Sequence, residues 1–317
     1  MSNYVLDCAQ EGHRAFRLKM FLCGLAALAL APAAMAATGL VCRVTTSGVS
    51  TANGSVWTQA MDLQTALVTS ACTEVWVAKG VYKPPTTTDT TISFNIRPGV
   101  AVYGGFAGIS TETQRSNRDP VANITVLSGD IDGNDTIDSN GIDKVSTDIV
   151  GSNSYHVVFM DGTKGTRVTA STVLDGFTIS GGDANSAGIN DGVYEYNGGG
   201  LYCFGAATDH ECSPTFSNIT FSGNNAKYYG GAMYNDGYDT GASSPSLSNV
   251  TFSGNSAGYG GGAMYNSGSS GTSSPTLSNV TFSGNSATSS SGTGGGAMYN
   301  DGTSGGTSNP ALSNVTF

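Results

Sequence analysis

The sequence predicts an all-β protein, a parallel β-helix whose coils each contain three strands and about 30 residues. Three observations lead to this prediction. A block of about 30 residues recurs in the second half of the chain, apolar and polar residues alternate inside each block, and glycine accounts for 45 of 317 residues. Alternation is typical of strands, and glycines allow many tight turns. Charged residues make up only 11 % and aromatic residues 9 %, which excludes a coiled coil and a disordered chain.

Residues 1–36 are predicted to be a signal peptide. Basic residues between positions 14 and 19 precede an apolar run over residues 20–31, and Ala34-Met-Ala36 fits the small-residue pattern of a cleavage site. The run is too short for a permanent membrane span, and no later apolar stretch is long enough for one. We therefore expect an exported protein, secreted or held at a cell surface, with no transmembrane helix in the mature chain.

The cysteines agree with export. Two of the six lie in the leader, and Cys42, Cys72, Cys203 and Cys212 remain. An even number in an exported chain suggests two disulfides, although several connectivities are possible. We expect Cys42–Cys72 and Cys203–Cys212 because each pair brackets one local segment, with unpaired thiols as the alternative. A zinc site is a poor fit, since no cysteine or histidine follows the C-x-x-C spacing.

Residues 37–165 are expected to form an N-terminal cap and the first irregular coils. Residues 62–68 have helical spacing of apolar side chains, at Leu63, Ala66 and Leu67. A short amphipathic helix can cover the open apolar end of a solenoid, so we expect this segment to be a capping helix. Longer strands are expected at residues 74–78, 100–103 and 155–159.

Residues 166–317 are expected to form the regular coils. The block at 213–224, Ser-Pro-Thr-Phe-Ser-Asn-Ile-Thr-Phe-Ser-Gly-Asn, recurs with small changes at 244–255 and 274–285 and in part at 309–317. Its prolines are 31, 30 and 35 residues apart, and Gly-Gly-Ala-Met-Tyr-Asn stands between successive blocks. An earlier, divergent coil is expected at residues 173–182 and 199–203.

Stacking of these copies predicts columns of identical side chains. We expect the three short strands of one coil to end at Asn249, Asn255 and Asn266, with inward phenylalanine and methionine columns. Asparagine at each corner can adopt a left-handed backbone and pair its amide with the asparagine one coil along. The expected structural positions are Phe221, Asn224, Met233, Phe252, Asn255, Met264, Phe282, Asn285, Met298 and Phe317.

At these residues the chain resembles bacterial exported right-handed β-helix proteins of the pectin-lyase-like superfamily. Phe-Ser-Gly-Asn with Gly-Gly-Ala-Met resembles the F-x-x-N and G-G-A-[ILV] pair of the chlamydial polymorphic outer membrane protein repeats, with Met in the Ile/Leu/Val place. Residues 75–84, 103–108 and 127–130 look like the entry region of that bacterial group. The resemblance covers nearly all of residues 40–317. It implies a right-handed parallel β-helix and a secreted or outer-membrane role, but no reaction, because one fold hosts many functions.

The last copy of the repeat is incomplete. The sequence ends at Phe317 inside the Val-Thr-Phe-Ser-Gly-Asn stretch, with no second cap. We therefore expect a truncated chain, with a possible outer-membrane anchor encoded beyond Phe317.

The densest acidic segment, residues 130–138 followed by Asp143, suggests a structural calcium site, because Ca²⁺ prefers several oxygen ligands. The candidate ligands are Asp130, Asp132, Asn134 and Asp138. Gly133 and Gly141 stand where an EF-hand would not place glycine, so this is no EF-hand, and a solvated acidic loop is the alternative. No other cofactor is expected, and His156, in an apolar strand, is expected to be a structural histidine with its hydrogen bonds satisfied.

The features together favour a non-catalytic exported bacterial surface protein, adhesin-like or autotransporter-passenger-like. Repetitive coils hold loops away from a membrane, and a loop of variable length such as residues 287–294 could bind an unknown protein or glycan. A net charge of −10 with 13 Lys and Arg residues excludes nucleic acid as a partner, since phosphate binding needs basic clusters.

Two other functions stay open. A secreted polysaccharide-active enzyme, similar to pectate lyases or glycoside hydrolases, needs cations or acids on one outer face, but residues 228–317 contain no Lys or Arg. Such an enzyme would depend on upstream residues such as Lys144, Lys164 and Arg167. An ice-binding β-helix is a minor alternative, suggested by expected hydroxyl columns. These columns are Thr220, Thr251, Thr281 and Thr316, beside Ser222, Ser253 and Ser283.

Overall fold

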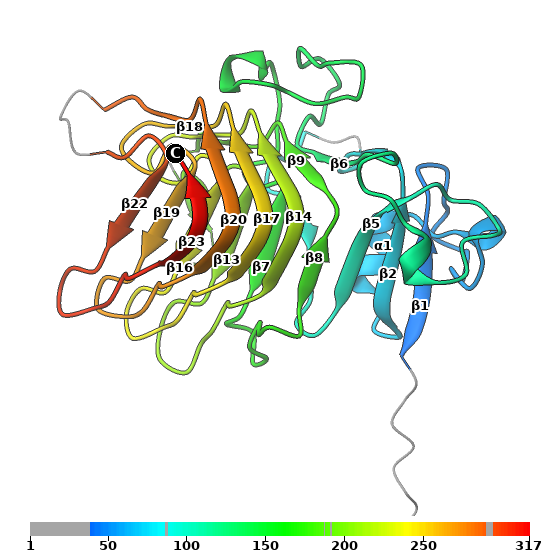
Figure 1. The fold of residues 1–317 in the computed structure, drawn as a ribbon, viewed down its shortest axis with the longest axis horizontal. Helices are drawn as coiled ribbons and strands as arrows, with labels where there is room; N and C mark the ends of the chain where they lie inside the picture. The colour runs from blue at the N-terminus through cyan, green and yellow to red at the C-terminus, as the bar shows by residue number, and fades with distance from the viewer. Residues whose placement is uncertain (1–38, 86–87, 187, 191, 290–293) are drawn as a thin grey trace, which may run out of the picture. The chain divides into compact units, whose positions relative to one another are not determined.

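The computed structural model describes residues 39–85, 88–186, 188–190, 192–289 and 294–317 (Figure 1). The expected signal peptide, residues 1–36, lies outside these ranges. Gly39–Phe317 forms one compact unit of stacked coils whose strands pair in parallel, which confirms the predicted parallel β-helix. In the described part of the chain, no helix is long and apolar enough to cross a membrane.

Three parallel sheets are formed by the described residues, and each strand pairs with its counterpart in the next coil. The largest sheet contains β1 (Leu40–Val44), β2 (Cys72–Ala78), β5 (Ala101–Phe106), β8 (Val173–Asp175), β14 (Thr215–Ser222), β17 (Ser246–Ser253), β20 (Thr276–Ser283) and β23 (Ala311–Thr316), in that order. The same sheet includes β3 (Gly80–Tyr82), β6 (Thr125–Ser128) and β9 (Thr178–Ser180), which pair in series alongside this path. The two halves of β14 pair with β8 and β9, so this one strand continues two shorter ones.

The other two sheets complete each coil. The smaller one contains β10 (Asp183–Ala184), β15 (Asn225–Ala226), β18 (Ser256–Ala257) and β21 (Ser286–Ala287). The third contains β4 (Phe94–Asn95), β7 (Val158–Asp161), β13 (Leu201–Phe204), β16 (Met233–Asp236), β19 (Met264–Ser267) and β22 (Met298–Asp301). Outside them lie an antiparallel hairpin, β11 (Ile189–Asn190) with β12 (Val193–Tyr194), and the short 3-10 helices η1 (Trp57–Gln59), η2 (Arg115–Asn117) and η3 (Ser146–Asp148).

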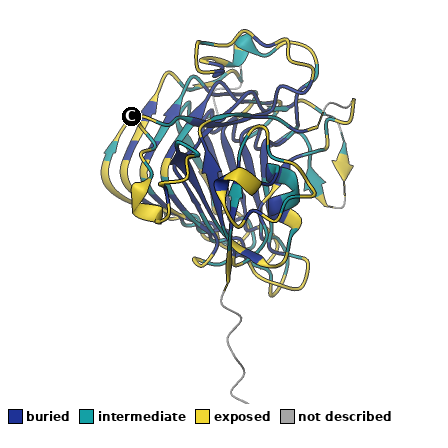
Figure 2. Ribbon diagram, turned by 90° about the vertical axis from the view of Figure 1, so that its right-hand side faces the viewer, coloured by how far each residue is buried: buried dark blue, intermediate teal, exposed yellow. Residues whose placement is uncertain are grey.

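The expected inward columns are present. Phe221, Phe252 and Phe282 are register partners, and their rings stack with centroids 4.9 and 4.8 Å apart. Met233 and Met264 pair in the same way in the third sheet and are fully buried. Figure 2 shows these buried strands running through the interior of the stack. Because parallel strands repeat at about 4.8 Å, identical side chains pack directly on one another.

The structure corrects the expected strand ends. β17 runs through Asn249 without a break and ends at Ser253, and the two-residue β18 follows it before β19. Asn249 adopts the left-handed conformation, with φ of 55°, which bends the strand inside its length. At Asn255 the left-handed residue is instead the preceding Gly254, with φ of 65°. Glycine has no Cβ and enters this region without strain, so it makes the corner in place of asparagine.

Buried asparagines form a ladder at this corner. The Asn224 Nδ2 donates to Asn255 Oδ1 at 3.0 Å, and the Asn255 Nδ2 donates to Asn285 Oδ1 at 2.9 Å. The Asn255 Nδ2 also donates to the Phe221 carbonyl at 3.1 Å. A second ladder joins Asn235 to Asn266 at 2.8 Å. The Asn255 amide therefore satisfies buried polar groups of neighbouring coils at once.

The N-terminal helix has the expected place and burial. α1 (Leu63–Val68) is capped by Asp62, whose side chain accepts a hydrogen bond from the Thr65 backbone N–H at 2.9 Å. Its apolar face, Leu63, Ala66 and Leu67, is buried in the main core beside β1, β2 and β4. The cap thus covers apolar surface that the first coils would otherwise expose.

The structure contains both expected disulfides. Cys42–Cys72 joins β1 to β2, with Cα atoms 5.5 Å apart, and Cys203–Cys212 joins β13 to the segment before β14, with Cα atoms 5.6 Å apart. The divergent coil expected at 173–182 and 199–203 is also present, as β8, β9 and β13.

Of the three longer strands expected upstream, two are present as β2 and β5, and the third starts later. Residues 155–157 precede β7. Their amides hydrogen-bond individually, that of Tyr155 to the Thr90 carbonyl and that of Val157 to the Gly199 carbonyl. The third strand is therefore shorter than the apolar run in the sequence.

The Asn255→Ala substitution tests the ladder. It removes the acceptor for the Asn224 backbone and side-chain N–H groups and the donor to Phe221, all of them buried. We expect the free energy of unfolding to fall by about 2–4 kcal/mol, measured by urea denaturation.

Asn249→Gly is the matched control. It removes an exposed ladder with a 3.3 Å hydrogen bond and keeps the left-handed backbone free of strain, so we expect a loss below about 1 kcal/mol. Equal losses for the two variants would show that the buried ladder has no special role.

Candidate functional site

A long connection between β6 and β7, residues 129–157, lies over the corners of later coils. Within it, the Asp143 carbonyl accepts a hydrogen bond from Ser222 Oγ at 2.7 Å, and the Ser146 backbone N–H donates to the Gly254 carbonyl at 3.1 Å. A Cβ at residue 223 would lie 2.7 Å from the Asp143 carbonyl oxygen. The Ser-Gly corners of the repeat therefore leave room for this connection, which we call the acidic loop.

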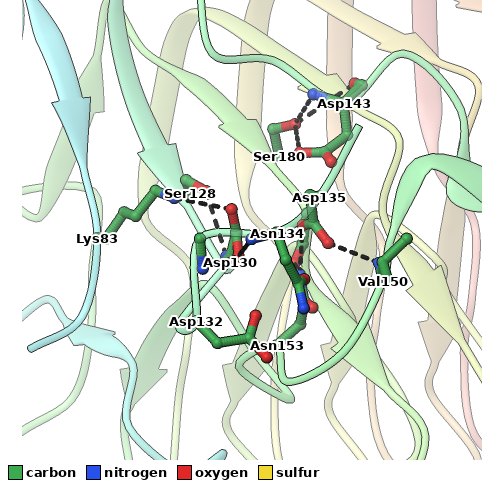
Figure 3. Close-up of polar contacts among 12 residues, drawn as sticks. Lys83, Ser128, Asp130, Asp132, Asn134, Asp135, Asp143, Val150, Asn153 and Ser180 are labelled. Atoms are coloured by element: carbon green, nitrogen blue, oxygen red, sulfur yellow. Dashed lines mark hydrogen bonds and ion pairs between the residues drawn. The ribbon is translucent and has the colours of Figure 1, made fainter. Parts of the chain in front are cut away.

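Three of the four predicted calcium ligands, Asp130, Asp132 and Asn134, lie near one another in the acidic loop (Figure 3). Asp130 is buried and accepts hydrogen bonds from Lys83 Nζ and from the Gly133 backbone N–H, both at 2.7 Å. Asp138 forms an ion pair with Lys144 at 2.8 Å. Among residues that the structure describes, no three His, Cys, Asp or Glu side chains form a group that could hold a metal ion.

The remaining candidates also serve the loop itself. Asp132 accepts a hydrogen bond from the Ser152 backbone N–H at 3.0 Å, and Asn134 lies close to Gly151. Three of the four candidates, Asp130, Asp132 and Asp138, are engaged by lysines or backbone amides. Calcium binding at these residues stays a prediction, since Ca²⁺ prefers six to eight oxygen ligands.

The acidic loop instead holds a buried carboxyl pair, Asp135 and Asp143. Asp135 accepts hydrogen bonds from the Val150 backbone N–H at 2.6 Å and from Asn153 Nδ2 at 2.7 Å, as Figure 3 shows. Asp143 is fully buried and accepts from Ser180 Oγ at 2.8 Å. The acidic segment pointed to this region, but its spacing could not single out these two residues.

Burial controls the charge of the pair. Burial, with the nearby charges of Asp143 and Asp130, raises the pKa of Asp135 to about 7. Burial also raises the pKa of Asp143, and the hydrogen bond from Ser180 lowers it in part. Two adjacent buried carboxylates repel, which favours a pair with one proton over a doubly charged pair.

An aromatic column follows the outward face of the third sheet. Phe159, Tyr202, Tyr234, Tyr265 and Tyr299 are register partners, with successive ring centroids between 5.0 and 6.1 Å apart. Two residues further along each strand, the neighbouring outward column includes acids. Tyr202 donates to Asp236 at 2.6 Å, and burial raises the pKa of that carboxyl to about 6.

A cavity of about 330 Å³ lies at the β4–β7 end of this column, and we call it the aromatic cavity. Its lining includes aromatic rings, carboxylates, a lysine, an imidazole and small polar groups. The main contributors are Asn95, Tyr155, His156, Phe159, Asp161, Lys164 and Glu195. Apolar rings with a few polar groups are typical of small-ligand sites, so this cavity is the second candidate site.

The hydrogen bonds of His156, which lines this cavity, differ from the expectation. Its Nδ1 lies 3.0 Å from the Gly198 carbonyl, an acceptor, so Nδ1 carries the hydrogen. Burial lowers the pKa of His156 to about 4, and the ring is neutral at neutral pH. Nε2 is therefore an acceptor, and within the described ranges it has no hydrogen-bond partner. The expectation that both ring nitrogens are satisfied is wrong for Nε2.

The other residues considered for catalysis or ice binding lie apart from this cavity, except Lys164. Lys144 pairs with Asp138, and exposed Arg167 lies 3.3 Å from Asp209. The threonine column follows the outward face of β14, β17, β20 and β23, but Ser222 beside it is buried under the acidic loop. The hydroxyl array is therefore partly covered.

One coil matches a known repeat. Residues 249–267 match the Chlamydia polymorphic membrane protein (Chlamydia_PMP) repeat, and they extend from the second half of β17 through β18 to the end of β19. The match includes Phe252, Asn255 and Met264, which form the inward columns. No curated protein and no solved structure matches the chain.

The carboxyl pair predicts a pH dependence of stability. Since both pKa values are raised above those of unfolded aspartate, the native state binds more protons between the ordinary value of 3.8 and about 7. The free energy of unfolding is therefore expected to fall as pH rises from about 4 to about 7, by up to about 1.4 kcal/mol per pH unit for one proton, and to level off above about pH 7. Urea denaturation at several pH values between about 4 and 8 measures this slope.

In Asp143→Asn the amide can donate to Asp135 without a shared proton, so the slope should become smaller than in the unmodified chain. Asp132→Asn, in the same loop, is the matched control and should keep the original slope. A slope that is the same in all three proteins would contradict proton sharing by this pair.

Proposed function

We propose that this chain is part of an exported bacterial surface protein, an adhesin-like or passenger-like β-helix that presents binding sites on its outer faces. The observation that carries the proposal is the Chlamydia polymorphic membrane protein repeat at residues 249–267, which lies in a stack of similar coils. Export would place the folded chain outside the cytoplasm, either secreted or at the outer membrane.

The physical properties of the stack support this role. Inward columns and buried asparagine ladders repeat from coil to coil, so the framework is a regular scaffold for the loops and faces outside it. Binding residues are commonly found on loops that a rigid scaffold positions. The expected loop at residues 287–294 lies partly outside the described residues, whereas the aromatic cavity lies within them.

The disulfides are compatible with export. Cys42–Cys72 and Cys203–Cys212 use all four cysteines that follow the expected leader. Disulfides persist in oxidising compartments, such as the periplasm and the cell exterior.

An adhesion assay tests the proposal. The full chain, expressed with its leader and collected in oxidised form, should bind saturably to cultured host cells or to an extracellular-matrix coating, because folded outer faces present the binding residues. Fluorescently labelled protein measures the binding, and unlabelled protein should compete. The same chain after reduction, alkylation and heat unfolding is the control. Binding no greater than that of the unfolded control, on cells and matrix alike, would contradict an adhesin role.

A polysaccharide-active enzyme is the second candidate, and one observation favours it. Asp161 and Glu195 line the same cavity, and glycoside hydrolysis commonly uses two carboxyl groups. This candidate predicts release of reducing ends from polygalacturonate or from neutral polysaccharides, with a loss of at least about 100-fold in Glu195→Gln. If no reducing ends are released from any of these substrates, the enzyme candidate is contradicted and the binding role remains.

A further inference from the structure

The aromatic cavity has the chemistry of a sugar site. We propose that it binds an uncharged sugar unit, a neutral hexose or an N-acetylhexosamine, at the end of a glycan chain. This inference rests on the proposed surface role and identifies the ligand class of one site. Its elements are the half-buried ring of Phe159, the carboxylates of Asp161 and Glu195, and the imidazole of His156.

The aromatic column supplies an apolar surface where it meets the cavity. Tyr202, the next ring along the column, is fully buried, and its centroid is 6.1 Å from that of Phe159. Phe159 is only half-buried and lines the cavity together with Tyr155. The apolar C–H face of a sugar ring can pack on such rings while its hydroxyl groups point to polar neighbours.

The carboxylates of Asp161 and Glu195 are hydrogen-bond acceptors, and they lie beside hydroxyl and amide groups of the lining that both donate and accept. Asp161 Oδ1 accepts from Thr163, and Glu195 Oε2 accepts from Ser186 Oγ at 3.0 Å. His156 also lines the cavity, and its buried Nε2 has no hydrogen-bond partner among the described residues. A ligand rich in hydroxyl donors matches this set.

Charge narrows the choice of sugar. Among the described lining residues, Asp161 and Glu195 carry negative charge and Lys164 positive charge, and the chain carries a net charge of −10. A uronate or a sialic acid would bring a further negative charge close to Asp161 and Glu195, which costs binding energy. A cationic peptide would meet this negative charge favourably, so it is the competing ligand that the experiment must exclude. A volume of about 330 Å³ is within the range of small-ligand cavities.

The experiment uses the full oxidised chain and named probes. Saturation-transfer NMR is recorded with N-acetylglucosamine, galactose, glucuronate and N-acetylneuraminate, each at about 5 mM, where even a millimolar Kd gives substantial occupancy. We expect saturation of at least one of the two uncharged sugars and none of the two anionic sugars. A lysine-rich peptide, tested in the same way, should show no saturation.

Three variants test the residues. Glu195→Gln and Asp161→Asn keep the shape of the lining, and Phe159→Leu keeps an apolar side chain, so all three should fold with melting temperatures close to that of the unmodified chain. Each should raise the Kd for the bound sugar by about tenfold or more, since each removes a desolvated contact with the sugar. Asp209→Asn, at an exposed position outside the lining, is the matched control and should bind normally.

Several results would overturn the inference: no saturation of either uncharged sugar, saturation of the anionic sugars or of the peptide instead, or equal binding by all variants. These results are separable from a failure of the proposed function. A chain that adheres to cells but shows no sugar binding at this cavity keeps its adhesin role and loses this site. A chain that binds sugar but adheres to no surface keeps the site and loses the role.

Discussion

The in-register pairing of parallel strands is the constraint on which the rest of this structure depends. It places each side chain directly over its counterpart in the next coil. A buried inward polar side chain therefore has an identical side chain beside it, which can serve as its hydrogen-bond partner. Asparagine fulfils this condition because its amide both donates and accepts, and Asn224, Asn255 and Asn285 join through it. In the preceding, divergent coil, Gly182 donates its backbone N–H to Asn224 Oδ1, which starts the ladder.

The candidate sites lie outside the inward columns, on the outer faces and loops of the coils. Left-handed glycines at the corners, such as Gly254, permit the acidic loop to approach the backbone closely. On the third sheet, in-register pairing stacks the aromatic side chains at one outward position into a continuous column. The aromatic cavity lies at the end of this column, at Phe159. The matched repeat, the disulfides and this cavity thus support one interpretation, a rigid exported scaffold with binding sites on its surface.

Much of the fold could be predicted from the sequence, because equivalent positions of successive repeats are the residues that pair in neighbouring coils. Phe252, Met264, the capping helix and the cysteine pairs are local or periodic signals. The candidate sites could not be predicted in the same way. Asp135 and Asp143 become a pair only when the acidic loop folds onto Ser180, and the aromatic cavity combines β4, β7 and the segment after β12. Asn249 kept its expected left-handed backbone but does not end its strand, since β17 continues through the bend.

Spin-label spectroscopy tests the in-register stack most directly. Nitroxide labels at Thr251→Cys and Thr281→Cys, in a background without the two disulfides, occupy register partners on the outward face of β17 and β20. Labels on partners in adjacent strands should be about 5 Å apart at the backbone and show strong spin–spin broadening. Labels at Ser246→Cys and Thr281→Cys, offset by five residues or about 16 Å, should show little. Similar spectra for both pairs, without broadening, would contradict the stacked β-helix.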